Sequence, residues 1–205
     1  NRVEALRDVI EKLPADVPVF VADLKVLNEI VGFNIHRGIL AAGVRPRPTP
    51  LAELLVRRGP FVVLEDLFNH DNIGSIFRNA AALGGAGVTV LLSPRTADPL
   101  YRKALRVSTG HALLIPWTRL ENWPGDLGYL SEEGIKLLAM TPGIGSREIR
   151  DVAAELMGHS SGGADGQARI ALIMGTEGPG LTDAAIARAD VRVRIDMPAG
   201  PHGEP

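Results

Sequence analysis

Residues 170–183 read IALIMGTEGPGLTD, and this stretch carries the clearest indication of the fold. Its first five residues are apolar throughout, as in a strand buried on both faces of a parallel sheet. The loop that follows has three glycines in six residues, which let a ligand approach the backbone, and Pro179 stiffens it. A plain turn between a strand and a helix explains the glycines equally well. It has no need of the carboxylate of Glu177.

The same alternation of apolar runs and helical patterns extends over most of the chain. Strands are expected at 61–64, 88–92, 112–116, 136–140, 170–175 and 191–195. Helices are expected between them at 73–83, 99–108, 120–133, 148–157 and 183–189. Alternating elements of this kind predict an α/β fold with a mostly parallel sheet and helices on both faces. Ligands bind such sheets at the carboxyl ends of the strands, so the loops 66–72, 141–146 and 175–182 are where the site is expected.

The first 59 residues follow a different pattern. Helices are expected over 2–13 and 23–31, and short strands over 17–21 and 39–44. Residues 45–50 read RPRPTP, and three prolines in five residues cannot sustain a helix or a central strand. We therefore expect an N-terminal unit over residues 1–45, a linker with a first helix over 46–59, and a main domain over 60–205.

Composition excludes several classes of protein. Of the 205 residues, 45% are hydrophobic and 22% charged, enough apolar material to build a core. The chain has no cysteine, and its five histidines are scattered singly, so neither disulfides nor a metal site is expected. No apolar run approaches the roughly 18–20 residues that cross a bilayer, and no signal peptide is visible. A cytoplasmic protein without a membrane partner is the expectation.

The net charge of −2 conceals a strong segregation of charge. Residues 71–119 carry six basic and two acidic side chains, whereas residues 120–184 carry four basic and ten acidic ones. A basic block inside a neutral protein can bind a polyanion through phosphate contacts. It can equally be a solvated helix face whose Arg and Lys stems cover apolar surface.

A second stretch, residues 64–85, runs from a strand end through a polar loop into a helix. The first turn of that helix holds Asn72, Gly74 and Ser75, and two glycines end it. An ordinary capped helix with Asn72 as its N-cap explains that asparagine. It does not explain Arg78, which stands in a run otherwise built from Ile, Phe, Ala and Leu.

Together the two stretches resemble the SpoU/TrmH class of the SPOUT superfamily, RNA ribose 2′-O-methyltransferases with a trefoil-knotted α/β fold. The family's first motif, N-x-G-x-x-x-R-x-A, is matched by Asn72, Gly74, Arg78 and Ala80. Its second motif, G-x-E-G-x-G-L, is matched by Gly175, Glu177, Gly178, Gly180 and Leu181. Its third motif opens I-P-M, and this chain has Ile195, Asp196 and Met197 at the expected spacing, with aspartate in place of proline.

The resemblance implies methylation of a ribose 2′-hydroxyl in structured RNA, in rRNA rather than tRNA, with S-adenosylmethionine as methyl donor and no metal. It assigns catalysis to Asn72, Arg78 and Glu177. It places the methyl donor against Thr141, Gly175, Thr176, Gly180, Ile195 and Met197. It also implies a homodimer with the active site at the subunit contact and RNA over a basic face. The candidates for that face are Arg95, Arg102, Lys103, Arg106 and His111.

The chain departs from the family pattern after the third motif. The family continues into S-L-N-V and a knot-closing helix, but residues 198–205 contain neither Ser nor Asn. We therefore expect the methyltransferase domain to be truncated and the knot-closing helix to lie outside this chain. Residues 17–44 resemble the tail of a ribosomal-protein-like RNA-binding domain, so residues 1–45 are expected to be part of a domain that binds the substrate RNA.

Two other functions remain open. One is a non-catalytic RNA-binding protein that keeps the fold. The other is a small-molecule nucleotide-binding α/β enzyme, which the absence of phosphate-loop motifs disfavours.

Overall fold

A computed structural model describes residues 2–36, 38–158 and 169–196 of the chain. The chain divides into two compact units, Asn1–Pro46 and Arg47–Pro205. Within the described ranges, no helix is both long enough and apolar enough to cross a membrane.

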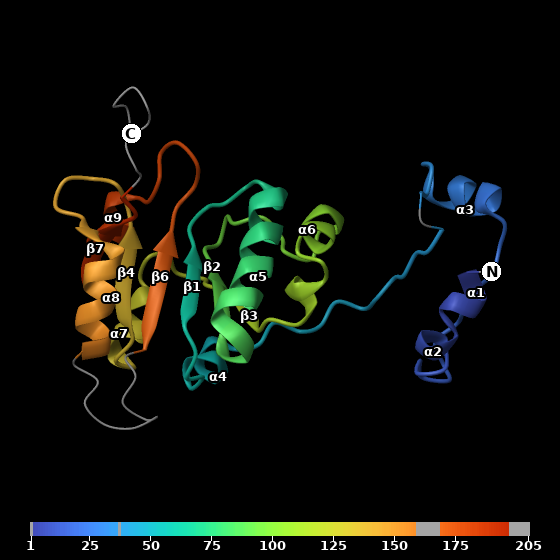
Figure 1. Cartoon of the computed structure of the whole chain (residues 1–205), viewed down its shortest axis with the longest axis horizontal. Helices are drawn as coiled ribbons and strands as arrows, with labels where there is room; N and C mark the ends of the chain where they lie inside the picture. Colours follow the sequence, from blue (N-terminus) through green and yellow to red (C-terminus); the bar gives the residue numbers. More distant parts are fainter. Residues whose placement is uncertain (1, 37, 159–168, 197–205) are drawn as a thin grey trace. The chain divides into compact units, whose positions relative to one another are not determined.

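The larger unit is built around a parallel sheet (Figure 1). In its described part the sheet has seven strands in the order β3-β2-β1-β6-β4-β7-β5. Their bounds are β1 Phe61–Leu64, β2 Thr89–Leu92, β3 Trp117–Arg119, β4 Lys136–Met140, β5 Arg147–Glu148, β6 Ile170–Met174 and β7 Val191–Arg194. At the centre, Val63 of β1 is in register with Leu91 of β2 and with Ile173 of β6. The predicted α/β fold with a parallel sheet is confirmed.

Helices cover both faces of this sheet. Their bounds are α4 Leu51–Leu55, α5 His70–Gly84, α6 Arg102–Val107, α7 Leu127–Glu132, α8 Ile149–Gly158 and α9 Asp183–Ile186. Successive strand residues point to opposite faces, so Phe61 and Val63 pack with α4 and α7, whereas Val62 and Leu64 pack with α5 and α6. On the latter face, α8 contributes Val152 to a separate cluster with residues of β4 and β7.

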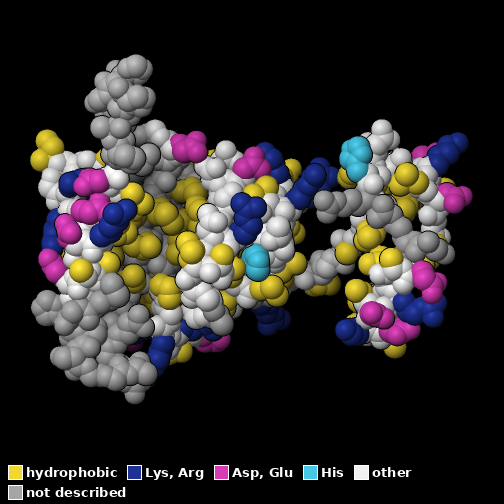
Figure 2. All heavy atoms as spheres, in the orientation of Figure 1, with side chains coloured by type: hydrophobic (Ala, Val, Ile, Leu, Met, Phe, Trp, Pro, Cys, Tyr) yellow, Lys and Arg dark blue, Asp and Glu magenta, His cyan; other side chains and the backbone are white. Residues whose placement is uncertain are grey.

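On the face of α5 and α8, the strip over β6 is less well covered. Ile170, Leu172 and Met174 alternate with buried residues along β6 and are only partly buried. Figure 2 shows hydrophobic side chains gathered there, between α5 and α8. At the far end of α5, the side chain of Leu83 is 87% exposed. This side of the unit therefore offers an apolar surface.

Helices α5 and α6 approach each other closely at Gly74. A Cβ atom at this position would lie 2.7 Å from both the carbonyl oxygen of Ala104 and the Cβ of Val107. The amide nitrogen of Ser108, just past the end of α6, would lie 3.0 Å from the same Cβ atom. The glycine of the first motif is therefore required by packing between two helices.

The strand predicted at 112–116 is wrong. A 3₁₀ turn, η2 (His111–Leu113), occupies this segment, and the strand begins at Trp117, which pairs with Val90. Two residues with positive φ, Thr109 at 52° and Gly110 at 86°, turn the chain from α6 into η2. Pro116 has no N–H to donate to a ladder, so regular pairing starts after it.

The N-terminal unit contains helices and no strand among its described residues. The helix predicted over 2–13 is two short ones, α1 (Arg2–Ala5) and α2 (Arg7–Ile10). The helix predicted over 23–31 is α3 (Leu24–Val31), with Asp23 and Gly32 as its caps. The strands predicted at 17–21 and 39–44 are absent, because neither segment has a strand to pair with. Ile35 is the one described apolar side chain of this unit that is buried.

Candidate active site

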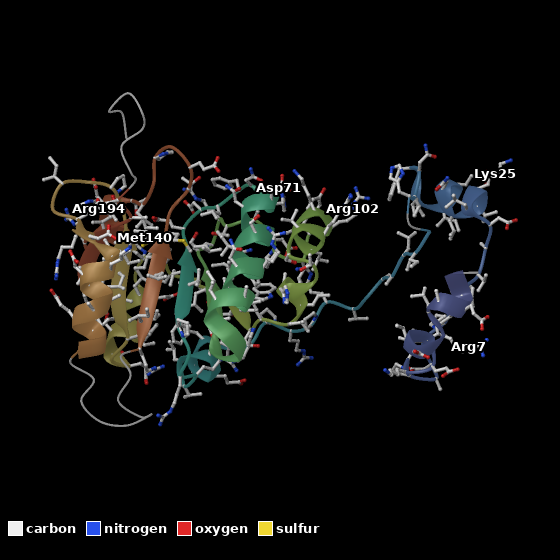
Figure 3. The ribbon with its side chains drawn as sticks, viewed as in Figure 1. Arg7, Lys25, Asp71, Arg102, Met140 and Arg194 are labelled. Carbon is white, nitrogen blue, oxygen red and sulfur yellow. The ribbon has the colours of Figure 1, made fainter. Side chains whose placement is uncertain are left out.

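The loops after β1, β4, β6 and β7 leave the sheet at one edge, because all these strands are parallel and adjacent. Figure 3 labels Met140 at the end of β4, Arg194 at the end of β7 and Asp71 in the first turn of α5, all at this edge. The site that the sequence predicts in these loops is therefore gathered in one region of the larger unit.

The two motifs meet through their polar side chains. The amide Nδ2 of Asn72 donates a hydrogen bond of 2.6 Å to Oε1 of Glu177, which lies 105 positions later in the chain. Asn72 is not the helix cap, because Asn69 holds that position and its side chain accepts from the amide of Asp71 at 2.9 Å. The amide of Asn72 is thus available to Glu177.

The loop after β6 is folded tightly on itself. A Cβ atom on Gly175 would lie 2.3 Å from the carbonyl carbon of Gly180. The amide of Gly180 donates to the carbonyl oxygen of Thr176 at 3.0 Å, and Gly178 and Gly180 have positive φ of 84° and 74°. These glycines are needed for the shape of the loop, and Glu177 is exposed at its tip.

Three predicted cofactor positions follow neighbouring strands. Thr141 follows β4, Gly175 follows β6 and Ile195 follows β7, and β4 lies between the other two. The amide of Thr141 donates to the carbonyl oxygen of Val193 at 2.9 Å, and the side chain of Ile195 is 59% exposed. Met197 lies outside the described residues.

Arg78 is not joined to the Asn72–Glu177 pair. It is exposed on α5, and it makes no hydrogen bond or ion pair with any residue in the described ranges. Six positions separate it from Asn72, or about 9 Å along the helix axis.

Arg95, predicted to bind RNA, is paired with Asp66. Its Nε donates to Oδ2 of Asp66 at 3.0 Å, and a second guanidinium nitrogen contacts the same oxygen. Asp66 has a positive φ of 52° and also accepts from the hydroxyl of Ser93 at 2.8 Å. Burial raises the pKa of Asp66, but the hydrogen bonds from Arg95 and Ser93 and the charge of Arg95 outweigh it and hold the pKa below its ordinary value of 3.8.

Several other cations of the basic block also have partners. Lys103 forms an ion pair with Asp71 at 2.6 Å, and Arg119 donates to the carbonyl oxygens of Ser93, Pro94 and Thr96. Arg102, labelled in Figure 3 at the start of α6, is also engaged in an interaction. Arg106 is exposed and His111 is partly buried. Part of the basic block thus stabilises loops and a helix end.

Two features near the first motif were missed from the sequence. The rings of His70 and Tyr101 pack with their centroids 4.3 Å apart, which pairs the first residue of α5 with the residue before α6. Glu65, directly after β1, is 1% exposed and accepts hydrogen bonds from Thr182 and Trp123. A charged residue at the end of a fully apolar strand is the signal that marks Glu65.

Comparison with known proteins places this geometry in a family. Residues 59–201 match the SpoU rRNA methylase family. The chain belongs to this family. Proteins of Mycobacterium tuberculosis and Mycobacterium bovis named as uncharacterized tRNA/rRNA methyltransferases are 42% identical over 200 residues, covering 98% of this chain. The chain spans 65% of the length of these relatives.

Weaker similarities extend to one further sequence and to solved structures with a similar fold. The 23S rRNA (adenosine(1067)-2′-O)-methyltransferase of Streptomyces azureus is 27% identical over 184 residues, or 89% of this chain and 62% of its own length. The SpoU methyltransferase AviRb of Streptomyces viridochromogenes has a similar fold, with a TM-score of 0.60 at 24% identity over 76% of this chain and 57% of its own. The AdoMet-bound rRNA methyltransferase of Sinorhizobium meliloti has a TM-score of 0.59 at 24% identity over 76% and 54%.

Proposed function

We propose that this chain is the catalytic portion of an S-adenosylmethionine-dependent methyltransferase that modifies a ribose 2′-hydroxyl in structured RNA, in rRNA rather than tRNA. The observation that carries the proposal is the contact between Asn72 and Glu177 at the carboxyl edge of the sheet. This contact joins the first motif, through Asn72, to the second motif, through Glu177, and neither side chain is needed for packing of the core. The ribose as acceptor is supported by the name of the Streptomyces azureus relative.

The residues at this edge suit S-adenosylmethionine. The closed loop at Gly175 and Gly180 presents backbone groups rather than side chains, which fits a nucleoside held by main-chain hydrogen bonds. Thr141, Thr176 and Ile195 would hold the group together with those glycines, and Met197 stays a prediction. The carboxylate of Glu177 favours a cationic ligand over a phosphate. When bound, the methyl donor supplies an electrophilic methyl group on a sulfonium.

Arg78 then acts on the RNA. A guanidinium scarcely loses its proton in proteins, so it is a poor general base. A fixed cation stabilises negative charge developing on the ribose oxygen and binds the adjacent phosphate through two N–H groups. The exposed position of Arg78 and its lack of a partner among the described residues support this role.

We also propose that the enzyme is a homodimer that binds RNA over the basic block. The partly open strip of Ile170, Leu172 and Met174 and the exposed Leu83 support a second copy as partner. The exposed Arg106 and the half-exposed ring of Tyr101 on His70 support contact with RNA phosphates and bases. The trefoil knot stays a prediction, because its closing segment lies outside the described residues.

The alternative is a non-catalytic RNA-binding protein, and two measurements separate the two functions. Calorimetry with S-adenosylmethionine should show binding, and tritiated methyl groups should be transferred to ribosomal RNA more than to tRNA. The label should protect the neighbouring phosphodiester from alkali, because a methylated 2′-oxygen cannot attack it. Failure to bind the methyl donor would favour the non-catalytic protein. Label on a base would contradict the ribose assignment.

The RNA surface has its own test. Arg106→Ala should weaken RNA binding and reduce the slope of log affinity against log salt by roughly 0.7–0.9, the loss of one phosphate contact. Arg188→Ala, which removes an exposed cation beyond α9, serves as the control and should leave the slope unchanged. Equal slopes for both variants would remove α6 from the RNA surface.

A further inference from the structure

Glu65 is a buried carboxylate to which the proposed function gives no task. It follows β1 directly and is 1% exposed. Its Oε2 accepts from the amide of Thr182 at 2.9 Å, and its Oε1 accepts from the hydroxyl of Thr182 at 2.7 Å. The indole N–H of Trp123 also donates to Oε1. Three donors from two distant segments therefore converge on one carboxylate.

Two of those donors belong to one residue of the loop that carries Glu177. Thr182 ends this loop and is the N-cap of α9, where its hydroxyl accepts from the amide of Ala185 at 3.2 Å. The hydroxyl thus donates to Glu65 and accepts from the helix at the same time. Glu65 therefore fixes both the backbone and the side chain of Thr182, 117 positions away along the chain.

The loop is consequently attached at both of its ends. At its start, Gly175 packs against Gly180, and at its end Thr182 is bound to Glu65. Between them, residues 177–179 are exposed. The contact of Glu177 with Asn72 depends on where these attachments hold the exposed part. Asn72 lies only seven residues after Glu65 in the chain. By binding Thr182, the carboxylate of Glu65 therefore fixes the loop of the second motif relative to β1, the strand that leads to the first motif.

We propose that Glu65 is a positioning residue that holds the loop 175–182 in the shape that binds S-adenosylmethionine and brings Glu177 to Asn72. The inference rests on the proposed function for its ligand. Its geometry stands on the hydrogen bonds to Thr182 and Trp123 alone. A carboxylate suits the task because both of its oxygens accept and it has no proton to place against an N–H group.

The test is Glu65→Gln in the full chain. An amide of nearly the same shape keeps one acceptor oxygen but turns an NH₂ group toward one of the three donors. In the absence of ligand, amide hydrogen exchange at residues 176–182 should accelerate by about tenfold or more, with β4 unchanged. The Kd for S-adenosylmethionine should rise by about tenfold, as the loss of a buried charge-assisted hydrogen bond implies.

Two variants separate positioning from general destabilisation. Asp190→Asn removes a carboxylate that accepts from the amide of Leu137 at 2.8 Å near the opposite end of β4, and it should change neither measurement at 176–182. Thr182→Ser keeps both donors to Glu65 and should show wild-type exchange at residues 176–182. Thr182→Val removes the hydroxyl donor and should reproduce part of the Glu65→Gln effect.

The outcomes are distinguishable from failure of the proposed function. A folded Glu65→Gln protein with wild-type exchange at 176–182 and wild-type Kd would overturn the positioning role and leave the proposed function intact. A wild-type chain that does not bind S-adenosylmethionine would overturn the proposed function. The exchange experiment would still decide whether Glu65 holds the loop.

Discussion

Arg78 can be replaced without breaking any hydrogen bond or ion pair among the described residues. Arg78→Ala should leave the thermal midpoint unchanged. Its affinity for S-adenosylmethionine should stay within about twofold of the wild-type value. Turnover should fall roughly 10²–10³-fold, the usual effect of removing a group aimed at developing charge. Methyl transfer to RNA under saturating methyl donor measures the loss, and calorimetry measures the affinity.

Asn79→Ala is the matched control for Arg78, because it changes the exposed neighbour on the same helix. It should retain turnover. A large loss of affinity for the methyl donor in Arg78→Ala would contradict the role on the RNA and indicate a role in cofactor binding.

Asp66 links the stability of the site to pH. Its pKa is lowered in the folded protein, since the hydrogen bonds and charge of Arg95 and Ser93 outweigh the effect of burial. The ionised carboxylate therefore stabilises the fold above its ordinary pKa of 3.8, and this contribution is lost as pH falls through the folded value. Urea unfolding should show Asp66→Asn less stable than wild type at pH 7, with the difference shrinking below pH 3.8.

Removing the cation tests the cause of that pH dependence. In an Arg95→Ala background, the difference in stability between the chain with Asp66 and the chain with Asp66→Asn should lose most of its dependence on pH. An unchanged pH profile in Arg95→Ala would show that Ser93 alone holds the carboxylate ionised.

For Gly74→Ala, the packing of α5 on α6 predicts a loss of stability, whereas helix propensity alone predicts a gain. Gly→Ala inside a helix ordinarily stabilises by up to about 1 kcal/mol. At Gly74 the new Cβ would lie 2.7 Å from the carbonyl oxygen of Ala104. Gly74→Ala should therefore destabilise by about 1–3 kcal/mol, the cost of overpacking, in urea unfolding. A stabilised Gly74→Ala variant would show that the helices can separate freely.

Continuous apolar runs predicted most strands of the sheet, but one such run does not form a strand. The run 170–174 is apolar at every position and indeed forms β6. The run 112–116 is equally apolar but forms η2, because Thr109 and Gly110 turn the chain and Pro116 delays pairing. An apolar run therefore predicts a strand correctly only where the preceding residues and the run itself can adopt an extended, hydrogen-bonded backbone.

The site was predictable where a motif spans a short stretch. Arg78 and Glu177 stood out because local structure does not explain them, and Asn72 stood out because it completes the first motif. The partners of Arg95, Lys103 and Glu65 were not visible, because each contact joins segments far apart in the chain whose proximity depends on the order of the strands. Arg95 illustrates the difference, since charge alone suggested RNA and the structure supplies Asp66.

The two units differ in how much core they contain. The large apolar clusters lie in the unit from Arg47 onward, whereas the described part of Asn1–Pro46 buries one apolar side chain, Ile35. Deleting residues 1–46 should therefore change the thermal midpoint by no more than about 2 °C and the Kd for S-adenosylmethionine by no more than about twofold. RNA affinity should fall, as the resemblance of the N-terminal segment to an RNA-binding domain implies.

The full chain, measured in the same buffer, is the control for this deletion. Unchanged RNA affinity would confine RNA binding to the larger unit. Loss of folding would show that the N-terminal unit contributes to the stability of the rest.

The central position of β1 has a consequence for synthesis. Its partner on one side, β2, follows about 28 residues later, but its partner on the other side, β6, follows about 110 residues later. Non-local pairing of this kind is slow, because a long loop must close before any contact stabilises it. Until β6 is made, β1 has an unpaired apolar edge to which another nascent chain can pair. The interval between translation of residue 64 and residue 174 is therefore the one in which this edge can lead to aggregation.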